Sequence, residues 1–253
     1  MRPMVLAQIS VGQHWTVHLF GMALYLDTVV SSLVAFAIVL AAGVYLRLRT
    51  TSGVPGRFQA MIEMVWETVD DYVARMVGPF ARWAVPLCTV LFFYILVSNW
   101  LELIPTGGRL TSPTADVNDT AALAVVVILT VHFTSIRQRG FGHYLKINYL
   151  HPSGLPKVFY VFLAPLNVVA QVSYPISLTL RLFGNMFAAA LMLQIIAMLP
   201  IYLSWIFNGA WKLFEGVFVD VIQAFIFALL TVIYLSLATM EDEHEGAAEA
   251  ATS

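Results

Sequence analysis

The sequence has little charge and almost no cysteine. Only 11% of its 253 residues are charged, whereas soluble domains carry about 25%. Hydrophobic residues make up 60% of the chain, and the mean hydropathy is +0.81. The single cysteine, Cys88, excludes an internal disulfide and a cysteine-based metal site. This composition excludes a water-soluble globule.

Other signals are also missing. The net charge of −2 gives no basic surface for nucleic acid. The chain has no glycine-rich phosphate loop ending in Lys-Ser or Lys-Thr. Its first 27 residues lack a basic segment leading into an apolar core with a small-residue cleavage site, so we expect no removable signal peptide. We therefore predict no cofactor, no metal site and no nucleotide chemistry in the chain itself.

What the chain does contain is long apolar runs. Several reach the ~20 residues that cross ~30 Å of hydrocarbon, and such runs must be helical because lipid offers the backbone no hydrogen-bond partners. We predict an all-α polytopic membrane protein that forms one domain with about five transmembrane helices. The predicted segments are an exposed N-terminal arm (1–27), a span (28–46), an amphipathic helix (58–77), two further spans (83–104 and 120–136), two long helices (158–199 and 206–237) and an acidic, disordered tail (241–253).

The segment 58–77 differs from the spans. Its apolar residues recur at helical spacing, while its acidic residues fall elsewhere. This pattern predicts an amphipathic helix that lies in the membrane interface. The two long stretches near the C-terminus exceed an upright span, so we expect them to be tilted, and the short turn at Pro200 makes them antiparallel.

Basic residues predict the orientation. Three arginines follow the first span, in 47–57, and four basic residues lie in 137–157. The loop 105–119 has only Arg109, and the turn 200–205 has no basic residue. Because basic loops stay in the cytoplasm, we expect the N-terminus outside and the C-terminus inside.

One charged side chain, Arg181, lies in the apolar stretch from Val158 to Leu199. A guanidinium in hydrocarbon costs roughly 2.5–3.5 kcal/mol on insertion scales, and it cannot lose its proton. One interpretation is a buried ion pair with Asp220 or Glu215 that holds two helices together. The other, which we favour, is that Arg181 faces another helix outside the chain. Ser177 and Asn185 stand four residues before and after it, on the same helical face.

The last apolar stretch also contains unexpected polar residues. On an α-helix Gly216, Asp220 and Gln223 share one stripe, while Glu215 lies roughly 80° from Gln223. Intramembrane carboxyls of this kind act in proton relays, so Glu215 and Asp220 are candidates for one. Asn185 and Gln223 could instead form ordinary interhelical hydrogen bonds. His132, near the end of a span, could join a proton path or simply lie in the interface.

Four segments together resemble subunit a of bacterial F-type ATP synthases over about residues 28–240. They are Arg181-Leu-Phe-Gly-Asn185-Met, Gln223-Ala-Phe-Ile-Phe, Thr51-Ser-Gly-Val-Pro-Gly-Arg-Phe-Gln and Ser112-Pro-Thr-Ala-Asp-Val-Asn. The resemblance implies a stator subunit that provides two aqueous half-channels against a rotating c ring. Arg181 matches the family's essential arginine, whose charge stabilises the ionised carboxylate of subunit c. Asn185 and Gln223 match polar residues at the same interface.

The resemblance also implies partners and a location. The partners are the c ring, a peripheral stalk of the b/delta type, the F1 sector and the lipid bilayer, and protons are the transported ion. The location is the bacterial plasma membrane, and ATP chemistry belongs to the partner subunits.

The chain departs from the family pattern at two positions. Many members carry a carboxylate nine residues after the arginine and a histidine seven before the glutamine, where this chain has Ala190 and Gly216. We expect Glu215 and Asp220 to take over proton entry, with Asp220 preferred because it shares a stripe with Gln223.

Two other functions are possible from the sequence. A self-contained ion-coupled transporter would need a substrate site and usually an inverted repeat, and neither is visible. A passive membrane scaffold would leave Arg181 with a purely structural role. Purification with a large c ring would separate the first from our interpretation, and an Arg181→Ala variant would separate the second.

Overall fold

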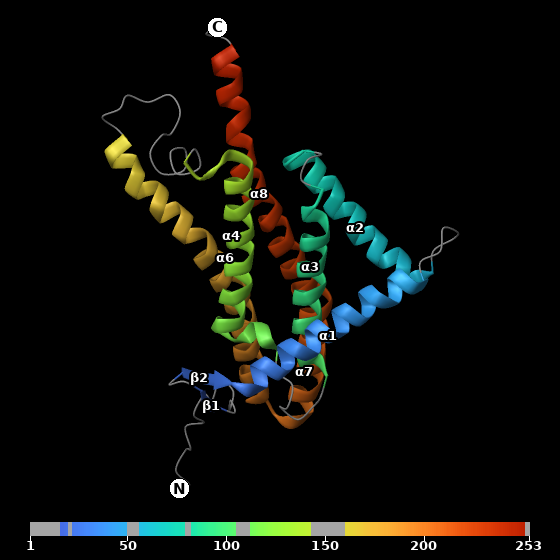
Figure 1. Cartoon of the computed structure of the whole chain (residues 1–253). Coiled ribbons are helices and arrows are strands. Elements are labelled where there is room, and N and C mark those ends of the chain that lie inside the picture. Colours follow the sequence, from blue (N-terminus) through green and yellow to red (C-terminus); the bar gives the residue numbers. More distant parts are fainter. Residues whose placement is uncertain are drawn as a thin grey trace.

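In the computed structural model, long helices form a single bundle (Figure 1). The structure describes residues 16–19, 22–49, 56–78, 82–104, 112–142 and 160–250. The helices are α1 (Leu26–Arg49), α2 (Arg57–Met76), α3 (Ala84–Trp100), α4 (Val117–Arg139), α6 (Tyr160–Ala197), α7 (Ile201–Phe214) and α8 (Asp220–Ala250). The β1–β2 hairpin and the last turns of α8 lie at opposite ends of the bundle.

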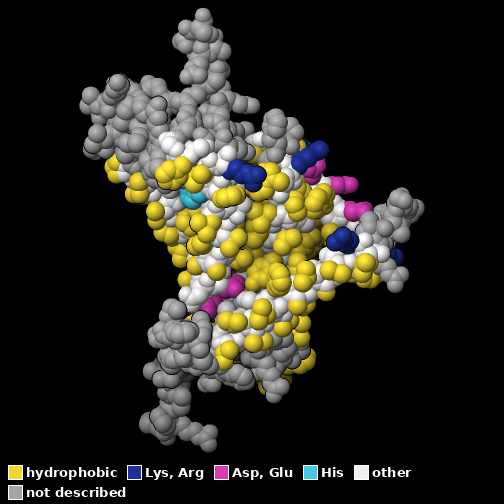
Figure 2. All heavy atoms as spheres, in the orientation of Figure 1, with side chains coloured by type: hydrophobic (Ala, Val, Ile, Leu, Met, Phe, Trp, Pro, Cys, Tyr) yellow, Lys and Arg dark blue, Asp and Glu magenta, His cyan; other side chains and the backbone are white. Residues whose placement is uncertain are grey.

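Five helices within the described residues are long and apolar enough to cross a membrane. They are Leu26–Leu48, Ala84–Leu103, Val117–Arg137, Val168–Ala197 and Ile201–Leu237. Figure 2 shows hydrophobic side chains over much of one face of the bundle, as expected for a surface that meets lipid. The predicted fold class, a polytopic helical membrane protein with about five spans, is confirmed.

Helix α2 is amphipathic, as predicted. Its buried residues Val69 and Val73 pack with apolar residues of α3 and α8. On its exposed side, Arg75 forms an ion pair with Asp71 at 3.1 Å. The helix is not among the membrane-crossing candidates. Its place in the membrane interface stays a prediction.

The centre of the bundle is built around α3, which packs against α8, α1 and α2, while α4 packs against α6 and α8. Buried apolar side chains of α3, α4, α6 and α8 form the main core; they are Leu91, Phe92, Ile95, Leu96, Ala124, Val127, Leu178, Leu182, Ala224, Phe227 and Ala228. Small residues among them let the helix backbones approach closely. This core joins α6 and α8 to α3 and α4, and the ring centroids of Tyr174 on α6 and Tyr234 on α8 also lie 4.8 Å apart.

Helix α6 is the longest element. Its 38 residues extend for about 57 Å at 1.5 Å per residue, almost twice the thickness of the hydrocarbon core. Figure 1 shows it inclined to α4 and followed, after a short turn, by α7 and α8, which run in the opposite sense. The prediction of two long, tilted, antiparallel membrane helices is therefore confirmed.

Three details differ from the sequence analysis. A short antiparallel hairpin pairs β1 (Thr16–Leu19) with β2 (Met22–Tyr25), inside the segment predicted to be a simple arm; residues 1–15 lie outside the described part. Helix α8 continues to Ala250, so the prediction of disorder from residue 241 is wrong up to that point, because alanine and glutamate favour a helix. The last span begins at Ile201 rather than 206 and is interrupted by a π-helical turn, Glu215–Val219.

Candidate functional site

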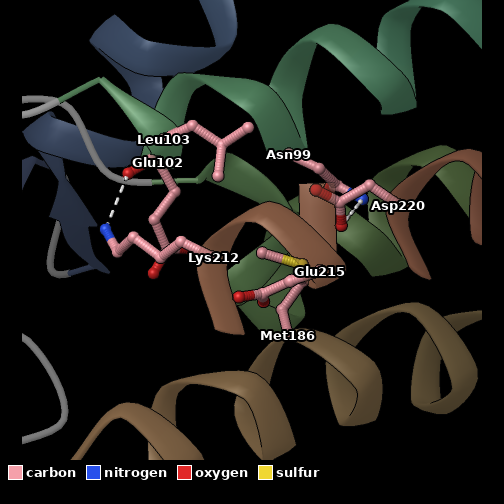
Figure 3. A pocket seen from close by; sticks show the side chains of 7 residues that line it. All are labelled: Asn99, Glu102, Leu103, Met186, Lys212, Glu215 and Asp220. Carbon is pink, nitrogen blue, oxygen red and sulfur yellow. Dashed lines mark hydrogen bonds between the residues drawn. The ribbon is translucent and has the colours of Figure 1, made fainter. Parts of the chain in front are cut away.

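Polar side chains from distant parts of the chain meet in one pocket between α3, α6, α7 and α8 (Figure 3). The residues that line it are Asn99, Glu102, Leu103, Met186, Lys212, Glu215 and Asp220. Three of them are carboxylic acids and one is a lysine. A concentration of ionisable groups inside a membrane bundle is expensive and marks a functional site.

The π-helical turn places Glu215 and Asp220 in this pocket. In it the backbone N–H of Asp220 donates to the carbonyl oxygen of Glu215, five residues earlier instead of four. Side chains five residues apart would point in different directions on an α-helix. The wider turn lets both carboxyls line the pocket, and both residues are buried, with 5% and 1% of their surfaces exposed. Glu215 and Asp220 therefore line the same pocket, which regular helical geometry would not allow.

The indole of Trp100 is hydrogen-bonded to this turn. Its Nε1–H donates to the carbonyl oxygen of Gly216 over 2.8 Å. A π turn disturbs the regular ladder of backbone hydrogen bonds, and an unpaired carbonyl inside a bundle is costly. The bond from α3 therefore stabilises the unusual backbone where the two acids enter the pocket.

A side chain at Gly216 would displace Leu103. A Cβ atom built there would lie 2.5 Å from Cδ1 of Leu103, so the end of that leucine side chain would have to shift. Leu103 belongs to the turn that follows α3, Leu101–Leu103, and it lines the same pocket. The space beside Gly216 is thus filled by a leucine from another element.

Asp220 is held by a side chain of α3. Nδ2 of Asn99 donates to Oδ1 of Asp220 over 3.2 Å, and Oδ1 of Asn99 accepts from the Thr114 hydroxyl over 2.5 Å. Asn99 is 1% exposed and Thr114 is fully buried. Neither residue was predicted from the sequence to be functional. Thr114 belongs to the Ser-Pro-Thr segment that carries part of the family resemblance, but nothing in the sequence shows that its side chain reaches Asn99.

Lys212 was also missed, although it lies in the same apolar stretch, three residues before Glu215. Its Nζ donates to the backbone carbonyl oxygen of Glu102 over 3.3 Å (Figure 3). Glu102 lies in the turn after α3. Lys212 is thus the one basic residue that lines the pocket, beside the three acids Glu102, Glu215 and Asp220.

Arg181 does not enter this pocket. Its side chain is exposed on α6, as is that of Ser177 one turn earlier. None of the ion pairs among the described residues involves Arg181. The alternative in which Arg181 forms an internal ion pair with Asp220 or Glu215 therefore has no support in the described structure.

Asn185 and Gln223 each have an unsatisfied amide. Asn185 is half-buried on α6, and Gln223 on α8 has only 7% of its surface exposed. Nδ2 of Asn185 and Nε2 of Gln223 are buried, and neither has a hydrogen-bond partner in the described part of the chain. The alternative of ordinary hydrogen bonds between helices therefore fails for these two nitrogen atoms.

His132 lies apart from these groups. It is half-buried on α4 and does not line the pocket. Across the described ranges, no group of three or more His, Cys, Asp or Glu side chains is arranged to hold a metal ion.

The fold and the pocket define a polytopic α-helical membrane protein that holds ionisable side chains inside its bundle. The family model for the ATP synthase A chain matches residues 29–236. The chain is 40% identical to ATP synthase subunit a of Acidothermus cellulolyticus over 247 residues, covering 96% of this chain and 88% of that protein. It is 41% identical to ATP synthase subunit a of Mycobacterium bovis over 250 residues, covering 94% and 97%, and 39% identical to that of Mycobacterium leprae.

The chain belongs to the ATP synthase A chain family. The resemblance found in the sequence is confirmed. Family membership makes the chain a multi-pass membrane subunit of the F0 sector, within a complex of other F0 and F1 subunits.

Proposed function

We propose that this chain is the stator that carries protons to and from a rotating c ring. It provides two offset aqueous half-channels, and Arg181 faces the carboxyl group that each c subunit carries. Protons enter through one half-channel, travel around with the ring and leave through the other. The rotation that results drives ATP synthesis in the F1 sector.

The exposed position of Arg181 carries this proposal. The residue lies near the middle of the span Val168–Ala197, where a permanent cation is costly unless a partner compensates it. The described part of the chain offers it no ion pair. A carboxylate on a neighbouring subunit is the partner that this charge requires, and a nearby cation favours the ionised form of a carboxyl group.

The two unsatisfied amides support a polar path inside the chain, behind the face that carries Arg181. Nδ2 of Asn185, one turn after Arg181, and Nε2 of Gln223 on α8 are buried without partners among the described residues. Both are donors, and buried donors of this kind can hold a water molecule of a half-channel. Ser177, one turn before Arg181, extends the face of α6 that carries Arg181.

Proton entry is assigned to the pocket of Glu215 and Asp220. Met186, which lines it, lies five residues after Arg181 on α6, a displacement of about 7.5 Å along the helix axis. This displacement is toward the α6–α7 turn, the side that the basic-residue pattern predicts to be outside. A proton held by Asp220 or Glu215 would therefore approach the rotor from the outer half of the membrane. His132, on α4, is a further candidate for the proton path.

The remaining assignments follow from the family. The partners are the c ring, a peripheral stalk of the b/delta type and, through the complex, the F1 sector. The chain lies in the bacterial plasma membrane with its N-terminus outside and its C-terminus in the cytoplasm. The concentration of basic residues in 47–57 and 137–157 supports this orientation.

ATP-driven proton pumping in inverted membrane vesicles tests the proposal. Arg181→Ala is compared with the wild type and with Arg75→Ala, an exposed arginine on α2 that has no role in the proposal. Copurification with the c ring checks assembly. We expect Arg181→Ala to assemble but to lose pumping and proton-driven ATP synthesis, while Arg75→Ala retains both. Pumping by Arg181→Ala at the wild-type rate would instead make the arginine a structural element of a passive scaffold.

A further inference from the structure

Asp220 is the last member of a chain of hydrogen bonds that begins in the connection between α3 and α4. Oγ of Ser112 lies 2.6 Å from Oγ1 of Thr114, Thr114 donates to Oδ1 of Asn99, and Nδ2 of Asn99 donates to Oδ1 of Asp220. All four side chains are buried, with at most 3% of their surfaces exposed. Bulk water therefore does not reach these side chains, and their polar atoms depend on one another for hydrogen bonds.

The bonds of this chain all point the same way. A hydroxyl group has one hydrogen to donate, and that of Thr114 goes to Asn99. In the short contact between Ser112 and Thr114, the donor must then be Ser112. Ser112 donates to Thr114, Thr114 to Asn99, and Asn99 to Asp220, so the carboxylate of Asp220 accepts at the end of the chain.

The same side chains can also bond in the opposite direction. A hydroxyl and a carboxamide each carry both a donor and an acceptor. If Asp220 is protonated, its O–H can donate to Oδ1 of Asn99 after the amide turns over. Nδ2 of Asn99 then donates to Thr114, whose hydroxyl donates to Ser112. Each of the three contacts keeps one hydrogen bond, and only the hydrogen of the Ser112 hydroxyl, at the far end of the chain, needs another acceptor. This matters because an unpaired buried polar group is expensive.

We propose that Ser112, Thr114 and Asn99 form a reversible hydrogen-bond chain that keeps Asp220 hydrogen-bonded in both its ionised and its protonated form. The inference rests on the proposed function, in which Asp220 takes up and releases a proton. Asn99 and Thr114 act as positioning residues, because they do not themselves carry the transported proton. The chain lets a buried carboxyl change its protonation state with a small rearrangement of three neutral side chains.

In the part of the chain that the structure describes, the other ionisable groups of the pocket form no hydrogen bond with Asp220 that could substitute for the one from Asn99. They are Glu102 from the turn after α3, Lys212 from α7 and Glu215 from the π turn. The side chain of Lys212 bonds to the backbone of Glu102, and Oε1 of Glu215 is buried without a partner among the described residues. Within the described residues, the side-chain hydrogen bond of Asp220 is the one from Asn99.

Two substitutions of Thr114 separate hydrogen bonding from packing. Thr114→Val keeps the shape of the side chain but can neither donate nor accept, whereas Thr114→Ser keeps the hydroxyl and loses a methyl group. Passive proton flow through F0 is measured in vesicles stripped of F1, with a potassium diffusion potential as the driving force and copurification of the c ring as the assembly control. We expect Thr114→Val to slow the flow about tenfold, the factor that 1.36 kcal/mol gives, and Thr114→Ser to stay within about twofold of the wild type.

The reverse order, with Thr114→Ser slower than Thr114→Val, would show that Thr114 acts through packing and would overturn the inference. Wild-type flow in Thr114→Val would also overturn it. If Thr114→Val does not assemble, Ser112→Ala decides: it removes only the end of the chain, and we expect flow about threefold slower, whereas an unchanged rate contradicts the inference.

Asp220→Asn distinguishes this inference from the proposed function. If that variant conducts protons at the wild-type rate, the role assigned to Asp220 in the proposed function is wrong. The inference about the reversible hydrogen-bond chain, which rests on that role, is then wrong as well. If Asp220→Asn slows the flow while Thr114→Val does not, Asp220 keeps its role and the inference about the chain alone is wrong.

Discussion

The backbone N–H of Asp220 donates to the carbonyl oxygen of Glu215, and this bond closes the π turn that interrupts the last membrane span. On a regular α-helix the two side chains would be about 140° apart. In the wider turn both line one pocket with Asn99 and Lys212. Since π turns recur at functional sites, this one identifies the part of the last span that we expect to handle protons.

Neutralising the two acids should affect proton flow unequally. Asp220 is hydrogen-bonded to Asn99 and nearly inaccessible, so we expect Asp220→Asn to slow passive proton flow through F0 by more than about tenfold, a barrier change of at least ~1.4 kcal/mol. Glu215→Gln should slow the flow less, because Oε1 of Glu215 has no hydrogen-bond partner among the described residues and we expect Asp220 to be the main site of proton entry. Both variants are measured in F1-stripped vesicles after assembly has been verified.

Asp71→Asn is the matched control for these acids. Asp71 lies on α2, where it is exposed and forms an ion pair with Arg75, and exposed pairs contribute little. Its replacement should leave both proton flow and assembly unchanged. A wild-type rate in Asp220→Asn, or an equal loss in Asp71→Asn, would contradict the assignment of proton entry to the pocket.

A branched side chain at position 216 should be destabilising while Leu103 is present, because the leucine side chain would have to shift. A Cβ atom at Gly216 would lie 2.5 Å from Leu103 Cδ1, and overpacking typically costs about 1–3 kcal/mol. We expect Gly216→Val to lower the thermal stability of the detergent-solubilised complex, and the double variant Gly216→Val/Leu103→Ala to restore it. Gly43→Val on α1, where a Cβ meets nothing within 4 Å, is the control. An unchanged stability in Gly216→Val alone would show that the site is not tightly packed.

Helix α1 should be loosened by removing two hydroxyl groups. Thr28 donates to Asp116 over 3.2 Å, and Ser32 donates to Asp119 over 2.6 Å, which connects α1 to the start of α4. Hydrogen bonds between membrane helices average about 0.6 kcal/mol, so Thr28→Val/Ser32→Ala should cost about twice that. Unfolding in mixed micelles measures the change, and faster amide exchange in α1 should accompany it. A free energy of unfolding equal to the wild type would mean that apolar packing alone holds α1.

Much of the fold could be predicted because lipid restricts the choices. Apolar runs of about 20 residues must become helices, and the spacing of apolar residues in α2 distinguished it from a span. The predicted limits of the spans differ from the observed ones by a few residues at most ends, since helix termini depend on local caps such as Asp116, which accepts from the N–H of Asn118.

The pocket could be predicted only in part. Glu215 and Asp220 are visible as acids in an apolar stretch, but regular helical geometry assigns them to different faces. The π turn that unites them depends on contacts with α3, including the bond from Trp100 to Gly216. Asn99 and Thr114 contribute through a contact between the end of α3 and its following connection, which residue spacing along one helix cannot show. Lys212 could have been predicted together with Glu215, because both lie in the same apolar stretch.

Crosslinking from the exposed face of α6 tests the central claim most directly. Cysteine is placed at Ser177, one turn before Arg181 and exposed like it, in a chain with the buried Cys88 replaced by alanine. A second cysteine is placed next to the carboxyl residue of subunit c, and oxidation follows in native membranes. Leu33→Cys on α1, where the leucine is 61% exposed, is the control. We expect a crosslink between chain and c ring from position 177 and none from position 33. No crosslink from position 177 in an assembled complex would contradict the claim that Arg181 faces the rotor.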